Sequence, residues 1–213
     1  MAARVICISR AICAGADAVA TQVGQELGFR CVDEEIIARA AERHNVDPGE
    51  LANVEVRKSF FTHLLEELAL GAGMAGYSHS GAMPDPGAIP IRSDSLRHLI
   101  RETIAATAKQ GNMVIVAHAA SYALGARGDV LRVLVTGSPS ARAARLAAQD
   151  GSKPDAAATR IRESDLARAD YLKRFYNVER ELPEHYDLIV STDTLAPAQA
   201  AAVIVATALA MNS

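Results

Sequence analysis

The 213-residue chain has no tryptophan, few aromatic residues (4%) and only three cysteines. The three cysteines, Cys7, Cys13 and Cys31, are odd in number and lack the spacing of a metal site, which excludes a disulfide framework and predicts reduced thiols. No apolar run approaches the roughly eighteen residues of a membrane span. Arg10 and Asp17 interrupt the apolar N-terminal stretch, so we expect that it is not a signal peptide. These absences predict a cytoplasmic protein.

The chain also lacks a surplus of positive charge. Its formal net charge is -3 and its pI is about 6.1. A general nucleic-acid binder or membrane-surface binder needs a basic face, so we expect neither partner. Local basic clusters could still bind a nucleotide or another small phosphate compound. The length suits a single domain over residues 1–213.

Short apolar runs rich in β-branched residues predict buried parallel strands at residues 4–9, 113–117, 130–136 and 188–191. Helical patterns lie between them, at residues 17–27, 34–44, 93–110, 139–148, 153–176 and 197–211. Strands that alternate with helices imply right-handed βαβ units. We therefore predict an α/β fold of three layers, a parallel sheet flanked by helices.

Residues 70–90 are rich in glycine, proline, serine and methionine and have no periodicity. The segment is long for an unstructured connection. It is either a mobile loop near a binding cleft or a surface insertion without a role, and the sequence favours neither reading.

Ligands of open α/β sheets bind beyond the carboxyl ends of the strands. This rule directs attention to residues 10–17, 118–124, 137–139 and 192–193. The first of these segments enters a helix, where free N–H groups and the helix dipole suit a phosphate. However, it contains a single glycine, Gly15, and taken alone it is no nucleotide-binding motif.

An ordered set of weak motifs nevertheless resembles the cytidylate kinase-like family. Residues 9–19 (S-R-A-I-C-A-G-A-D-A-V) resemble its S-R-Q-x-G-S-G-G-R-x-I loop, and residues 27–37 its L-G-x-x-x-Y-D-x-x-x-I. Residues 114–124 are similar to V-I-V-G-R-x-A-x-x-x-L. Residues 165–171 and 186–195 are similar to D-x-x-R-x-x-Y and Y-D-L-x-I-N-T-D-x-L.

The resemblance implies a P-loop kinase fold with a helical segment that binds a nucleoside monophosphate and a lid-like helix at about 153–176. The activity it implies is phosphoryl transfer from ATP, with Mg²⁺, to CMP or a related acceptor. By the same analogy, Ser9 and Gly15 lie in the nucleotide-binding loop and Asp33 lies on the acceptor side. Arg162, Asp165 and Arg168 lie in the lid.

The loop departs from the family pattern where phosphate charge must be met. Ala14 and Ala16 stand at positions of the family's glycine cluster, Asp17 replaces its arginine, and Ala18 offers no hydroxyl for a metal. An acidic residue at this point repels a triphosphate. Asp17 is expected to cap the helix that it opens, in preference to a catalytic or metal-binding role. Arg10 is retained, and it either reaches a phosphate or pairs with Asp17.

Other candidates come with alternatives. His118 stands where the resemblance leads one to expect arginine, and it either contacts a ligand or is hydrogen-bonded at the cleft edge. Arg162, Asp165 and Arg168 share one helix face, as a phosphate clamp oriented by its central aspartate or as a solvated ion-pair surface. Cys13 precedes a helix N-terminus, which can lower the pKa of a thiol.

Three functions therefore remain open from the sequence. The first is a kinase that uses Arg10 as its missing cation, with ATP and Mg²⁺. The second is a pseudokinase that binds a nucleotide or phosphate without catalysis. The third is an interaction protein, compatible with a homodimer, that has no nucleotide ligand.

Overall fold

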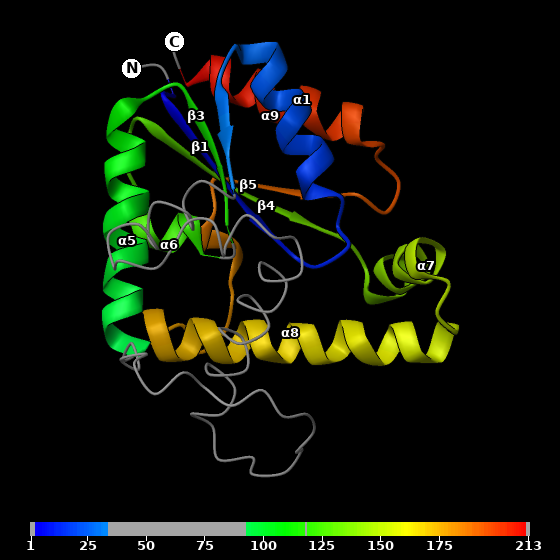
Figure 1. Ribbon diagram of the computed structural model, residues 1–213. Coiled ribbons are helices and arrows are strands. Elements are labelled where there is room, and N and C mark those ends of the chain that lie inside the picture. Colours follow the sequence, from blue (N-terminus) through cyan, green and yellow to red (C-terminus); the bar gives the residue numbers. More distant parts are fainter. Residues whose placement is uncertain (1–2, 34–92, 118, 212–213) are drawn as a thin grey trace, which may run out of the picture.

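The computed structural model describes residues 3–33, 93–117 and 119–211. The predicted helix at 34–44, the predicted loop at 70–90 and His118 lie outside these residues. Within them, five parallel strands form one sheet in the order β2-β3-β1-β4-β5. Helices lie on both sides of the sheet (Figure 1), which confirms the predicted α/β architecture.

The five strands are β1 (Val5–Arg10), β2 (Arg30–Val32), β3 (Met113–Val116), β4 (Val130–Thr136) and β5 (Leu188–Ser191). The bounds of β4 and β5 confirm the predicted strands at those residues, but β5 is not buried as predicted, because it is an edge strand with two exposed residues. The strand β2 was missed because it has three residues, two of them exposed, at the edge of the sheet. A run of three residues is too short to show the alternation of apolar and polar residues by which a strand is recognised.

The two faces of the sheet have separate apolar cores, because successive side chains of a strand point to opposite faces. Ile6 and Ile8 of β1 pack with the helices α1 (Ala16–Leu27) and α9 (Pro197–Ala210). Val5 and Cys7 face the other side. There they meet α5 (Ser93–Gln110) and α6 (Ala120–Leu124), of which α6 was missed by the sequence analysis.

Two further helices, α7 (Pro139–Asp150) and α8 (Pro154–Tyr176), pack on each other beyond the sheet (Figure 1). Their ends follow from the local sequence, since both begin with proline at the first helical position. The helix α7 ends at Gly151, and α8 ends at Asn177, each in the left-handed conformation that terminates helices. The long α8 coincides with the predicted lid-like segment.

The two helices are joined by a small apolar cluster, which consists of Ala143, Leu146, Ala157 and Ile161. The side chain of Ile161 is fully buried. Because α7 and α8 both carry arginines that reach the loop after β1, this cluster also sets the position of those arginines.

We expect Ile161→Ala to lower the free energy of unfolding by roughly 2–5 kcal/mol, because it leaves a cavity between α7 and α8. The control on the same helix is Leu166→Ala, whose side chain is 66% exposed, and it should cost no more than about 0.5 kcal/mol. Urea unfolding of both variants measures the difference. Equal costs would show that the two helices do not pack as described.

Candidate active site: the loop after strand β1

The strand β1 lies in the middle of the sheet, between β3 and β4. The next strand along the chain, β2, lies on the β3 side of β1, whereas β4, which follows β3, lies on its other side, so the strand order changes direction here. Such a switch point is where α/β sheets bind ligands. Residues 11–15 connect β1 to α1 as a tight turn, in which the Ala14 N–H donates to the Ala11 carbonyl at 3.2 Å. The Ala11 N–H is bonded in turn to the Val135 carbonyl of β4. The loop is thus fixed to the sheet at its first residue.

The loop keeps a glycine-like backbone although it has lost most of its glycines. Cys13 has φ 57° and Gly15 has φ 74°, both in the left-handed region. A side chain in this region costs roughly 1–2 kcal/mol relative to glycine. The first N–H groups of α1, which follow Gly15, have no acceptor within the helix. The backbone shape suited to an anion is therefore present, at the expense of strain at Cys13.

Four carbonyl oxygens, one at the last residue of β1 and three in the loop, each accept a hydrogen bond from a side chain of a distant element. The donor and acceptor pairs are Arg168 to Arg10 (3.1 Å), Arg142 to Ile12 (3.4 Å), Arg145 to Cys13 (3.1 Å) and Thr192 to Ala14 (2.9 Å). These donors come from α7, α8 and the end of β5. The predicted segments 10–17 and 192–193 therefore do meet, together with arginines that the sequence analysis did not single out.

Those missed arginines had a recognisable signal. Arg142 and Arg145 are three residues apart at the start of a helix that follows a strand, so they share a helix face near the carboxyl edge of the sheet. Arg142 is 4% exposed and also donates to the Gly137 carbonyl at 2.9 Å. A buried arginine needs such partners, because an unpaired charge in the interior is costly.

At the mouth of the loop, Arg10 is paired with two carboxylates. The guanidinium of Arg10 binds the Asp17 carboxylate, and its Nη2 lies 3.4 Å from Asp33 Oδ2. One cation thus faces two anions. Of the two alternatives for Arg10, the structure shows pairing with Asp17. The expectation that Asp17 caps α1 is wrong, since the N-cap is Gly15 and the carboxylate is bound to Arg10.

The predicted clamp on α8 is not formed. Asp165 accepts two hydrogen bonds from Arg142, Nη1 to Oδ1 at 2.9 Å and Nη2 to Oδ2 at 2.6 Å. The prediction that Asp165 orients Arg162 and Arg168 is therefore wrong. Arg162 is exposed and donates to the Thr159 hydroxyl of its own helix. Asp165 pairs instead with Arg142, which lies on another helix. Residue spacing along α8 alone could therefore not identify this partner.

Arg168 is held by Glu181, which the sequence analysis also missed. Its Nη2 donates to Glu181 Oε1 at 2.6 Å and its Nε to Oε2 at 3.3 Å, and the Tyr186 hydroxyl also donates to Glu181. Burial acts to raise the pKa of Glu181, but the hydrogen bond and charge of Arg168 outweigh it and lower that pKa. Burial, followed by the bond to Glu181, raises the pKa of Tyr186.

Two further candidates have structural partners. Ser9 is fully buried, and its hydroxyl lies 3.1 Å from that of Ser121 in α6. Its hydroxyl thus joins β1 to α6. For Cys13, burial raises the pKa of the thiol, whereas its position before a helix N-terminus had suggested a lowered value. The proposal of a reactive thiolate is therefore not supported by its surroundings.

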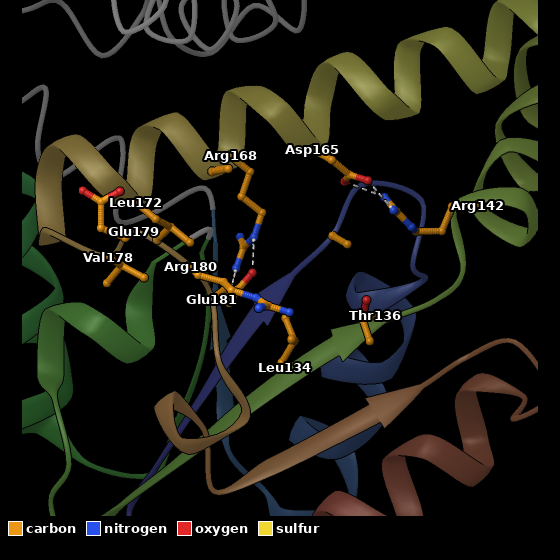
Figure 2. A pocket seen from close by; sticks show the side chains of 12 residues that line it. Leu134, Thr136, Arg142, Asp165, Arg168, Leu172, Val178, Glu179, Arg180 and Glu181 are labelled. Atoms are coloured by element: carbon orange, nitrogen blue, oxygen red, sulfur yellow. Dashed lines mark hydrogen bonds and ion pairs between the residues drawn. The ribbon is translucent and has the colours of Figure 1, made fainter.

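A cavity of about 330 Å³ lies between the end of β4, α8 and the segment after α8 (Figure 2). It has twelve lining residues, which include Arg142, Asp165, Arg168 and Glu181. Both ion pairs described above therefore form part of its wall. Within the described ranges, no helix is long and apolar enough to cross a membrane.

Glu181→Gln should lower stability at neutral pH by roughly 2 kcal/mol or more, because it removes the carboxylate that pairs with the largely buried Arg168. The pKa of Glu181 is lowered in the folded state, so the contribution of its charge to stability is complete above the ordinary glutamate pKa of 4.5 and disappears as the pH falls through the folded pKa. The variant should therefore lose less stability than the natural chain between about pH 5 and pH 2. Urea unfolding across that range measures this. The exposed Glu184→Gln is the control, and an identical pH profile for Glu181→Gln and the natural chain would contradict the assignment.

Cys13→Gly should stabilise the protein by up to about 1 kcal/mol, because glycine adopts the left-handed backbone without strain. Gly15→Ala should destabilise it by roughly 1–2 kcal/mol for the opposite reason, although nothing lies within 4 Å of the added methyl group. Denaturant unfolding of both variants tests the described loop conformation. Two shifts of the same sign would be inconsistent with it.

The profile of the cytidylate kinase-like family matches residues 5–194 of the chain. Several solved structures share the fold. An uncharacterised protein from Eubacterium ventriosum is 14% identical with a TM-score of 0.67, over 98% of this chain and 99% of that one. TT1252 from Thermus thermophilus is 14% identical with a TM-score of 0.53, over the whole of both chains. The shikimate kinase from Acinetobacter baumannii, in complex with shikimate, is 12% identical with a TM-score of 0.52, over 97% of this chain and 93% of that one.

No curated protein matches the chain. The solved structures are too distant in sequence to show more than a common fold, that of P-loop kinases. The family match, in contrast, spans most of the chain, from the start of β1 to the residues that follow β5. It includes the loop after β1, the whole of α8 and the end of β5. The protein belongs to the cytidylate kinase-like family.

Proposed function

We propose that this protein binds a nucleoside monophosphate, CMP or a related compound, and that it transfers a phosphoryl group from Mg-ATP slowly or not at all. The observation that carries this proposal is the shared Arg10 guanidinium. Asp17 and Asp33 both bind it, so the charge of Arg10 is already engaged by carboxylates of the chain.

Among the residues that the structure describes, those around the loop do not fit a triphosphate with its metal ion. Phosphoryl transfer depends on cations around the moving group. Here Arg10 is bound to Asp17, and Arg142 to Asp165, while Arg168 is bound to Glu181. Ala18 supplies no hydroxyl in the first turn of α1. The loop shape is retained, whereas the charge that would make use of it is neutralised from within the chain.

A ligand with a single phosphate group requires less positive charge at this site than a triphosphate does. A monophosphate carries less negative charge than a triphosphate, so the repulsion from Asp17 that opposes its binding is weaker. The side chain of Asp17 is 71% exposed, so solvent screens this repulsion and the carboxylate can move away from Arg10. This supports binding of the acceptor nucleotide without efficient transfer.

Asp17→Asn should strengthen Mg-ATP binding about fivefold, because it removes one unit of repulsion at a screened site, worth about 1 kcal/mol. Asp17→Arg, which restores the cation of the family pattern, should strengthen it by a further fivefold or more. The matched control is Asp155→Asn, which makes the same charge change in the first turn of α8. Calorimetric titration measures each affinity, and release of ADP with CMP as acceptor measures turnover.

The natural chain should be stabilised against thermal unfolding by CMP and show little response to Mg-ATP. Fast turnover by the natural chain would contradict the proposal. An unchanged Mg-ATP affinity in both Asp17 variants would show that charge is not what limits the site. No response to any nucleotide or to phosphate would leave the third reading, an interaction protein with the homodimer as its simplest form.

A further inference from the structure

The cavity beside α8 is separate from the phosphate-facing side of the loop. Leu134 and Thr136 of β4 line it, whereas Leu131, Val133 and Val135 of the same strand point to the opposite face, into the core beneath α1 and α9. The loop's free N–H groups belong to the start of α1, which lies on that opposite face. A molecule in the cavity would therefore lie behind the loop.

The charges on the cavity wall cancel in pairs except at one residue. Arg142 is bound to Asp165 and Arg168 to Glu181, and Glu179 lies 2.9 Å from the Lys173 amine. Arg180, which is exposed at the edge of the cavity, is the exception (Figure 2), because it has no hydrogen bond or ion pair within the part of the chain that the structure describes. The cavity thus presents one uncompensated positive charge.

The rest of the wall is largely apolar. Five aliphatic residues line it, which are Ala11, Leu134, Ala169, Leu172 and Val178. Its volume, about 330 Å³, is at the lower end of the range for small-molecule sites, which combine such apolar walls with a few convergent polar groups. Of these, Leu172 is almost fully buried.

We propose that this cavity is a second ligand site, which binds a small organic anion with one acidic group and a compact apolar body. Arg180 binds the acidic group, as a guanidinium binds carboxylate or phosphate, and the aliphatic wall takes the apolar part. This site is independent of the function proposed for the loop. It adjoins the loop all the same, since Ala11 follows β1 and Arg168 donates to the Arg10 carbonyl.

The first experiment uses isobutyrate and isobutyl phosphate as probes, at millimolar concentrations, with acetate and inorganic phosphate as matched anions that lack the apolar body. The thermal unfolding temperature of the full chain should rise by several degrees with at least one isobutyl compound, because a ligand at a concentration well above its dissociation constant stabilises the folded state. Acetate and phosphate should have much smaller effects. The stronger probe identifies the acidic group, carboxylate or phosphate ester.

Arg180→Gln should weaken binding of the active probe at least tenfold, the effect of losing a charge-assisted hydrogen bond. The control is Arg127→Gln, a surface arginine before β4, which should bind the probe as the natural chain does. A second variant, Ala169→Phe, should also weaken binding, because Ala169 lines the cavity and the added ring takes up space there. Absence of any shift with both isobutyl compounds, or a shift that Arg180→Gln retains, would overturn the proposal.

The two proposals fail separately. Asp17→Asn changes the loop and should leave the isobutyl response unchanged, whereas Arg180→Gln should leave the response to CMP and Mg-ATP unchanged. If Asp17→Asn abolished the isobutyl response, the probe would be bound at the loop and the cavity site would be refuted. If the isobutyl response survived while CMP had no effect, only the function proposed for the loop would be refuted.

Discussion

Hydrogen bonds from arginine side chains to backbone carbonyl oxygens hold the loop after β1 in place. Three of the four donors to its carbonyl groups are guanidinium groups, which come from α7 and α8. Hydrogen bonds to charged groups contribute roughly 1.5–3 kcal/mol each, enough to offset the strain of a non-glycine residue at Cys13. Most P-loops are shaped by glycine and charged by lysine or arginine. This chain keeps the shape by using its arginines as supports.

The same arrangement explains the charge at the site. Arg142 and Arg168 can support the loop in a largely buried position only because Asp165 and Glu181 neutralise them. Arg10, at the mouth, is neutralised by Asp17 and Asp33. In the part of the chain that the structure describes, these three arginines near the loop are therefore engaged within the protein. Within the described residues, the chain thus combines the fold of its family with a loop whose neighbouring arginines Arg10, Arg142 and Arg168 are each paired with carboxylates.

The sequence allowed the fold to be predicted because its signals are local. The apolar runs at β4 and β5 and the proline and glycine at helix ends mark elements within a few residues. The strand β2 escaped because three residues give no period. The site was harder to predict. Pairing of Arg10 with Asp17 spans seven residues and was one of two alternatives, whereas Arg142–Asp165 and Arg168–Glu181 depend on how α7 and α8 meet the sheet.

A crystal structure grown at high sulfate concentration tests the central claim most directly, since sulfate occupies working phosphate loops. The account predicts that Cys13 and Gly15 keep their left-handed conformations, that Arg142, Arg145 and Arg168 remain bound to the loop carbonyl groups, and that Asp17 stays on Arg10 with no sulfate at the start of α1. A sulfate bound there, with Asp17 turned away and Arg10 or Arg168 bound to the anion, would contradict it. That result would show a phosphate site whose cations are available for catalysis.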